Sequence, residues 1–225
     1  MDFVKLLQSF EDLLFELLSW VIYFPLTLWR VVSNPLGTIR YSNHEQTQSD
    51  SERYTDTISP PLFLLVCISI AHVVSLALRA PQLQSDTELG RIATASDENF
   101  IITTAFLYAL LPMFAAWRYT SAKRMPLERK YLRPPFYGQC YLAGTYALLL
   151  STATSLTQTA IPTWHLPGLA GVITATIWYL VVQTLMFRAS LGWSTPRAAL
   201  LAIRAYVEAM LAFLAGALVI TSLPA

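Results

Sequence analysis

Long runs of apolar residues alternate with short polar breaks along most of this chain. A helix crosses the hydrocarbon core of a membrane with about 20 apolar residues, and it satisfies its own backbone hydrogen bonds there. Five runs meet this length, and the polar breaks between them are unfavourable inside a membrane helix. The sequence therefore predicts an all-α integral membrane protein, a five-helix transmembrane bundle with spans at residues 58–78, 100–117, 136–156, 166–187 and 198–223.

The first 24 residues follow a different pattern. Polar side chains recur there at three- and four-residue steps, while large apolar side chains fill the opposite face. Pro25 breaks or kinks the apolar stretch that follows. We therefore expect residues 1–30 to form an amphipathic interfacial helix and an elbow, with a sixth span or re-entrant segment over residues 10–29 as the alternative.

Residues 31–57 separate this helix from the first span. From residue 41 onward they are rich in Ser, Thr, Gln, Asp and Glu and almost lack aliphatic side chains. Such a composition is typical of a polar linker. We expect three parts in the chain: the helix and elbow at 1–30, a cytoplasmic linker at 31–57, and the membrane domain at 58–225.

The distribution of Lys and Arg predicts the orientation, because cytoplasmic loops are enriched in these residues. Residues 118–135 carry six basic residues and one acid, Glu128. The loop at 79–99 has two basic residues against four acids, and 158–165 has no Lys or Arg. We therefore expect a cytoplasmic N-terminus and a periplasmic C-terminus.

Composition supports a membrane protein, with 55% hydrophobic and only 13% charged residues. The 15 basic residues nearly cancel the 14 acidic ones, so net charge gives no support for nucleic-acid binding. Twelve arginines against three lysines are typical of a GC-rich bacterial genome. The expected location is the bacterial cytoplasmic membrane, and the first expected partner is the lipid bilayer.

The polar face of the N-terminal helix is acidic, which is the wrong sign for attraction to anionic headgroups. A better partner is the basic loop between the second and third spans, expected on the same side. Docking would join Glu11, Asp12 and Glu16 to Lys123, Arg124, Arg129 and Lys130. The alternative is that the acids only solvate an interfacial helix.

Catalytic signatures are missing from the sequence: there is no HExxH, GxSxG, Walker or GxGxxG motif. The three histidines are scattered, and none stands near a Cys, Asp or Glu at metal-ligand spacing. We therefore expect neither an enzyme, nor a cofactor, nor a metal site.

Ionisable residues inside the spans form the candidate intramembrane polar site, because charge is costly in hydrocarbon. His72 lies three residues after Ser69 on the first span. Arg204 and Glu208 are four residues apart on the last span, so a local ion pair is the simplest interpretation. The alternative is a proton relay in which His72 meets Glu208 inside the bundle.

Small and hydroxylated residues cluster in the third and fourth spans, among them Gly144, Ser151, Ser155, Gly168 and Gly171. Residues of this kind allow helices to approach closely, so packing is the default explanation. A polar pore lining is the alternative.

Short motifs resemble the bacterial branch of the Ypt-interacting protein (Yip) domain family over about residues 30–222. They are Asn34-Pro35-Leu36, Ser59-Pro60-Pro61-Leu62-Phe63-Leu64, Leu111-Pro112 and Tyr137-Gly138. The acidic aromatic motif that opens the eukaryotic domain is absent, so a trafficking or GTPase-linked role is not carried over. The resemblance implies a five-span fold and its topology.

Two function classes follow from these patterns. The first is a non-enzymatic membrane organiser or subunit of a membrane complex, which acts through the N-terminal helix, the basic loop and small-residue helix faces. The second is a small channel or permease for ions or small solutes, assembled as a homo-oligomer. An intramembrane enzyme is a third, weaker reading.

Overall fold

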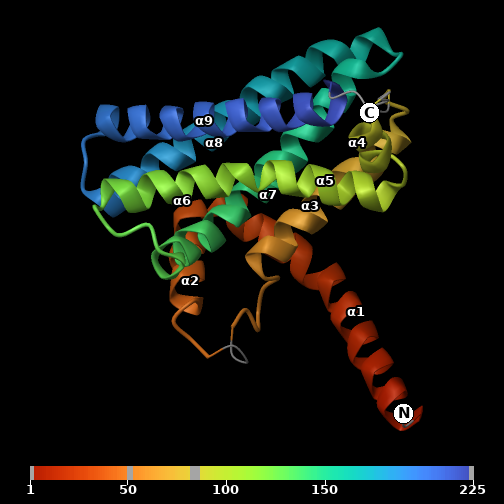
Figure 1. Cartoon of the computed structure of the whole chain (residues 1–225), viewed down its shortest axis with the longest axis horizontal. Coiled ribbons are helices and arrows are strands. Elements are labelled where there is room, and N and C mark those ends of the chain that lie inside the picture. The colour runs from red at the N-terminus through yellow and green to blue at the C-terminus, as the bar shows by residue number, and fades with distance from the viewer. Residues whose placement is uncertain (1–2, 50–52, 82–86, 223–225) are drawn as a thin grey trace.

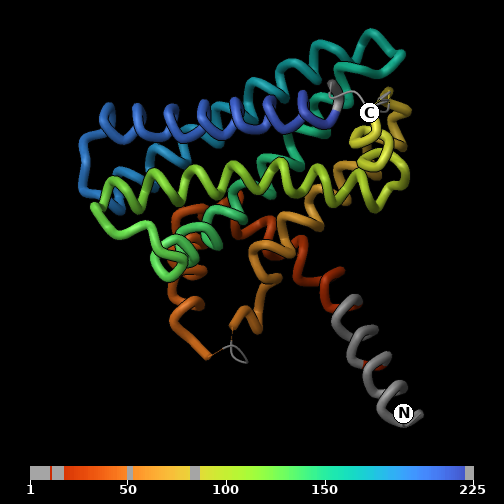
Figure 2. Tube along the Cα trace, in the orientation of Figure 1, coloured from red at the N-terminus to blue at the C-terminus, as the bar shows by residue number. Residues whose placement is uncertain are grey.

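The structure is a computed structural model that describes residues 3–49, 53–81 and 87–222, without the side chains of 3–10, 12–17 and 221–222. Every element in this part of the chain is a helix, as the sequence predicts (Figures 1 and 2). In chain order the elements are α1 (Phe3–Ser33), α2 (Pro35–Glu45), α3 (Pro60–Ala77), α4 (Glu88–Ala93), α5 (Asp97–Tyr108), α6 (Leu110–Ala122), α7 (Arg129–Gln158), the short 3-10 helix η1 (Pro162–Trp164), α8 (His165–Leu191) and α9 (Thr195–Ser222).

Within the described residues, four helices are long and apolar enough to cross a membrane. They are Pro60–Ala77, Asp97–Ala122, Pro162–Leu191 and Thr195–Ile220. These four coincide with the first, second, fourth and fifth predicted spans. The predicted third span, 136–156, lies in α7, which is not among the four because tyrosine, glutamine and hydroxyl side chains dilute its apolar residues.

The least apolar of the long helices, α7, is the centre of the bundle. It packs against α2, α3, α6 and α8, and ten consecutive positions, 138–147, are buried. Inside this stretch Gln139 forms a reciprocal amide hydrogen-bond pair with Gln183 of α8. The Tyr146 and Tyr206 hydroxyls lie 2.7 Å apart and join α7 to α9. Protein surrounds these polar side chains, which explains how a central helix tolerates them.

Glycines allow α3 and α8 to approach α7 closely. A Cβ on Gly144 would lie 3.0 Å from the Leu64 Cα of α3. A Cβ on Gly168 of α8 would lie 2.7 Å from the Thr157 backbone nitrogen. These positions agree with the packing interpretation of the small residues.

The second predicted span is two helices, α5 and α6, with a break at Ala109. Pro112 follows three residues later and has no N–H to donate to the carbonyl of Tyr108. The break thus lies where proline interrupts helical hydrogen bonding. In Figure 1 the two helices still run along nearly one line beside α9.

The N-terminal region differs from the expected elbow at Pro25. Helix α1 continues through Pro25 to Ser33, and the chain turns at Asn34 instead. The Asn34 side chain accepts a hydrogen bond from the Gly37 N–H at 3.0 Å, and Pro35 occupies the first turn of α2. The chain therefore turns where Asn34 and Pro35 start a new helix, and not at Pro25.

The expected linker at 31–57 also differs, because α1 runs into it and α2 fills residues 35–45. Thr38, Ile39 and Ser42 of α2 are buried, and α2 packs on α7. Tertiary contacts thus order a segment whose composition is typical of a flexible linker.

The bundle has two distinct ends in Figure 1. The α6–α7 and α8–α9 connections lie at the left, and α4 and the α7–α8 connection lie at the right. We call the left end the basic end, because Lys123, Arg124, Arg129 and Lys130 lie on or beside the α6–α7 connection. The right end is called the opposite end.

The close contact of α8 with α7 predicts a specific cost for Gly168→Ala. The added methyl meets backbone atoms of Thr157 and Ala153 that cannot move aside. We expect a loss of about 1–3 kcal/mol in the free energy of unfolding, measured by thermal denaturation in detergent.

Gly216→Ala is the matched control, because its methyl meets only the flexible end of Leu107. This variant should unfold at the wild-type temperature or above it, since alanine favours helix over glycine. Equal unfolding temperatures for the two variants would contradict the packing argument.

Candidate functional site

A cavity of about 960 Å³ lies at the basic end, where α3 and α7 begin. Five parts of the chain form its wall: α1, Gln46 at the end of α2, residues 53–59, the first turns of α3 and the first turns of α7. Its lining residues are Ser19, Trp20, Tyr23, Gln46, Arg53, Tyr54, Thr55, Thr57, Ile58, Ser59, Pro61, Leu62, Leu65, Arg133 and Tyr137. The cavity exists only because residues 53–59 are held against three helices.

Tyr54 fixes the first half of that segment. Its backbone has a φ of 56°, in the left-handed region, and its N–H donates to the Glu45 carboxylate at 2.6 Å. Its hydroxyl lies 3.1 Å from the Ser42 hydroxyl and accepts from the Gln46 amide at 2.8 Å. These bonds fold the chain back onto α2.

Asp56 fixes the second half. Its carboxylate accepts from the Tyr41 hydroxyl at 2.5 Å and from the Arg30 guanidinium at 3.0 Å. Burial raises the pKa of Asp56, but the hydrogen bonds from Tyr41 and Arg30 and the Arg30 charge outweigh it and hold the pKa below its ordinary value. Burial and the Asp56 carboxylate raise the pKa of Tyr41. At neutral pH the phenol is therefore protonated, the carboxylate is charged, and the three side chains form one hydrogen-bonded cluster.

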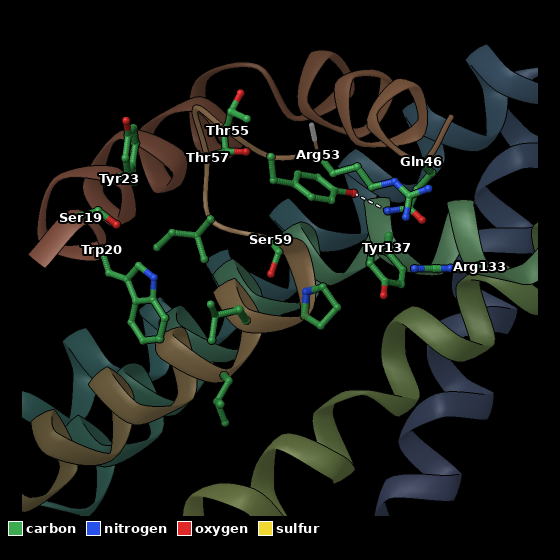
Figure 3. Close-up of a pocket in the computed structure, with 15 residues that line it drawn as sticks. Ser19, Trp20, Tyr23, Gln46, Arg53, Thr55, Thr57, Ser59, Arg133 and Tyr137 are labelled. Carbon is green, nitrogen blue, oxygen red and sulfur yellow. Dashed lines mark hydrogen bonds between the residues drawn. The ribbon is translucent and has the colours of Figure 1, made fainter. Parts of the chain in front are cut away.

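The cavity has a polar end and an apolar end (Figure 3). Gln46, Arg53, Arg133 and Tyr137 gather at one end, whereas Trp20 lies at the other. The Arg133 guanidinium lies 5.3 Å from the centre of the Tyr137 ring, and Arg53 Nε donates to the Gln48 carbonyl at 2.9 Å. Among the described lining residues there are two arginines and no carboxylate. The described lining is therefore amphiphilic, with basic and amide groups at one end and an indole at the other.

Binding fits this lining better than catalysis does. Hydroxyl groups are present, but the described lining includes no histidine, carboxylate, lysine or cysteine to activate them. A nucleophilic hydroxyl needs a neighbouring base.

His72, the predicted intramembrane histidine, is buried on α3 and has a different partner from the one the relay requires. Its Nε2 lies 2.9 Å from the Asp97 carboxylate at the start of α5, and its ring lies 4.8 Å from the Phe100 ring. Ser69 donates to the Leu65 carbonyl of its own helix at 2.9 Å. No contact among the described residues supports the His72–Glu208 relay, because Glu208 is paired with Arg118 and Arg204.

A second cavity, of about 560 Å³, lies beside His72 toward the opposite end. Hydroxyl groups and an amide dominate its polar surface, contributed by Ser75, Thr104, Tyr108, Ser151, Thr154, Ser155 and Gln158. Two residues for which the sequence leaves packing or a pore lining open, Ser151 and Ser155, thus line one cavity.

Glu208 lies between two arginines. Its carboxylate accepts from Arg118 of α6 in a two-pronged pair, with Nε at 2.5 Å, and from Arg204 Nε at 3.0 Å. The Glu208 side chain is 24% exposed, whereas that of Arg204 is 63% exposed. The interhelical Arg118 pair is thus the more protected contact, and it joins α6 to α9.

The predicted docking of α1 to the basic loop stays a prediction. Glu11 is exposed, and the side chains of Asp12 and Glu16 lie outside the described residues. Among the ion pairs of the described residues, none joins Glu11 to the loop. The loop residues have other places: Lys123 and Lys130 lie over the rings of Tyr119 and Tyr131, Arg124 has a φ of 56° and Arg129 begins α7.

No protein family, curated protein or solved structure matches this chain. The resemblance to the Yip-domain family therefore stays a prediction from the sequence.

Sequence reasoning missed Asp97, Arg118, Arg53 and Arg133 as site residues, because it counted them only as loop charges. Asp97 offered one signal, since it follows Ser96, whose side chain caps α5 by accepting the Asn99 N–H. For Arg118 the signal was weaker: it lies one residue beyond the predicted span, on a helix that continues to Ala122.

The geometry around Glu208 predicts that Glu208→Gln and Arg118→Gln are costly. Each leaves a charge without its interhelical partner, and we expect a loss of about 3 kcal/mol in the free energy of unfolding. Arg204→Gln removes an exposed pair and should cost under about 1 kcal/mol. Unfolding by denaturant in detergent micelles measures all three.

The double variant Arg118→Gln, Glu208→Gln completes the test. Because it removes both partners, it should cost clearly less than the two single losses added together. Additive losses would show that the two side chains do not interact.

Proposed function

We propose that this chain is a non-enzymatic polytopic protein of the bacterial cytoplasmic membrane that acts as an organiser or subunit of a membrane complex. In this proposal the basic end faces the cytoplasm, and the N-terminus lies on that side. The positive charge of the α6–α7 connection supports this orientation.

Helix α7 is the fifth membrane helix in this proposal. Its 30 residues give a length of about 45 Å, enough to cross a bilayer of about 30 Å. Its low hydropathy is no obstacle, because protein rather than lipid covers positions 138–147.

Residues 18–33 of α1 would lie partly embedded. This part of the helix is apolar. One face, with Thr27 and Val31, is buried against the bundle. Large apolar side chains remain exposed on the other face, which we call the α1 stripe: Leu18, Val21, Ile22, Leu26 and Trp29.

The observation that carries the proposal is the cavity at the basic end. It is built from five parts of the chain, α1 among them, and its described lining has groups for binding but none for activating a nucleophile. A cavity assembled in this way suits a protein that binds a ligand or a partner at the membrane face. The α1 stripe then supplies a contact surface within the membrane for another protein chain.

A photo-reactive amino acid at Trp29 tests this role in the native membrane. We expect one discrete protein adduct of defined mass, either a second copy or another membrane protein, because a subunit presents the stripe to one partner. The same amino acid at Ile173, which is exposed on α8, is the control and should give lipid adducts only. Lipid adducts alone at both positions would contradict the proposal.

A small permease is the second candidate, and the cavity beside His72 favours it. The two cavities lie at opposite ends of the α3–α7 contact, with Phe63 and Leu64 packed against Gly144 between them. Hollows on either side of one packed contact are the arrangement that alternating access would use.

Solute flux into liposomes tests the permease. Thr154→Leu fills the second cavity, so it should reduce the uptake of a small neutral solute such as glycerol at least about tenfold. Thr174→Leu places the same change on an exposed face of α8 and should leave uptake unchanged. Uptake by the wild type no faster than by protein-free liposomes would contradict this candidate.

A further inference from the structure

We infer that His72 is the recognition residue of the cavity beside it, where its Nδ1 accepts a hydrogen bond from a hydroxyl of a small polyhydroxylated molecule. This inference rests on the permease candidate, because it names what binds in the cavity that the candidate uses. It concerns binding and not passage across the membrane. Three features point to this class of ligand: the unpaired nitrogen of His72, the hydroxyl groups of the lining and the rim of the cavity.

His72 has one nitrogen in a hydrogen bond and one without. Its side chain is only 5% exposed, and Nε2 lies 2.9 Å from the Asp97 carboxylate. A carboxylate can only accept, so Nε2 carries the proton, and Nδ1 of the neutral ring is then an acceptor. Nδ1 is buried and has no hydrogen-bond partner in the described part of the chain. Because an unpaired buried acceptor is costly, a ligand that donates to Nδ1 gains the energy of satisfying it.

Helix α5 holds the ring in this orientation. Asp97 bonds to Nε2, and the Phe100 ring lies 4.8 Å from the imidazole between ring centres. Both residues belong to the first turn of α5, whereas His72 belongs to α3. A rotation that exchanged the two nitrogens would break the bond to Asp97. The acceptor is therefore fixed before a ligand arrives, which lowers the entropy cost of binding.

Hydroxyl groups from neighbouring helices line the same cavity. The hydroxyl oxygens of Tyr108 on α5 and Ser151 on α7 lie 3.0 Å apart. Thr104 and Thr154 line the cavity as well, and their side chains form no hydrogen bond with another described residue. A hydroxyl both donates and accepts, so such a lining matches a ligand whose own groups do both. Several hydroxyls on one small molecule meet this requirement.

The size and rim of the cavity fit a small water-soluble molecule. Its volume of about 560 Å³ is within the range of small-molecule sites. Ile68, Leu150 and Phe100 supply apolar surface for the carbon chain of a ligand. The lining also includes Pro81, beyond the end of α3, and Gln158, the last residue of α7, and both are exposed. The cavity thus extends to the surface at the opposite end, where a ligand enters from water.

Nitrogen NMR of the full-length protein in detergent tests the role of Nδ1, with ¹⁵N-labelled histidine and xylitol as the probe. At about pH 8, where an ordinary histidine is neutral, the His72 Nδ1 signal should be that of an unprotonated nitrogen. Xylitol should shift this signal toward that of a hydrogen-bonded nitrogen and leave the signals of His44 and His165 unchanged. A protonated Nδ1 without ligand, or a signal that a high concentration of xylitol does not move, would overturn the inference.

Two substitutions at His72 separate the roles of its nitrogens. The amide of His72→Gln reaches the position of Nε2 and keeps a donor for Asp97, so this variant should bind xylitol about 5- to 10-fold more weakly than the wild type by calorimetry. The amide of His72→Asn lies at the position of Nδ1 and gives up Asp97, and it should keep the affinity within about twofold. The reverse order would overturn the assignment to Nδ1. If thermal denaturation shows that either variant is unfolded, the NMR result on the wild type decides.

A second ligand tests the chemical class. 1,5-Pentanediol has the carbon chain of xylitol without its inner hydroxyls, and it should bind at least about tenfold more weakly, because the hydroxyls of the lining then lose their partners. Equal or tighter binding of pentanediol would overturn the assignment to a polyhydroxylated ligand.

Binding and transport have separate outcomes. If xylitol binds at His72 as expected but neither xylitol nor glycerol enters liposomes faster than without protein, the inference stands and the permease candidate fails. If glycerol enters and Thr154→Leu slows it while xylitol leaves Nδ1 unchanged, the inference is wrong and the permease candidate stands.

Discussion

The burial of α7 is the constraint on which the rest of this structure depends. Lipid gives helices little reason to associate, since hydrocarbon chains are as apolar as leucine. Association has to come from close packing and from polar groups that protein can satisfy and lipid cannot. Positions 138–147 supply both, with Gly144 admitting α3 and Gln139 pairing with Gln183 of α8. The other helices are arranged so that this stretch meets protein on every side.

The same constraint explains why the central helix is the least apolar one. A helix that faces lipid needs apolar side chains around most of its surface, whereas an enclosed helix needs complementary neighbours. Tyr146 illustrates this, since its hydroxyl would be costly in hydrocarbon but lies 2.7 Å from that of Tyr206. Hydropathy along a sequence therefore underestimates the helix that organises the bundle, and it identifies best the helices at the periphery.

Sequence patterns predicted the elements that depend on local composition, such as the apolar stretches of α3, α8 and α9. They failed where a distant residue decides the outcome. Helix α2 lies in an expected linker because Tyr54 and Asp56 bind back to it, and no local pattern reveals such contacts. The pairs His72–Asp97 and Arg118–Glu208 join residues 25 and 90 positions apart. The candidate cavity depends on such contacts at every wall, so the sequence alone could not reveal it.

Charged residues in this protein hold distant parts of the chain together. Glu208 is enclosed by two arginines, and Asp56 is held by Arg30 and Tyr41, so these charges serve the fold. The bonds to Asp56 also hold residues 53–59 in place, and this segment forms part of the cavity wall together with α1, α3 and α7. The cavity at the basic end is thus a product of the same long-range contacts that fix the fold.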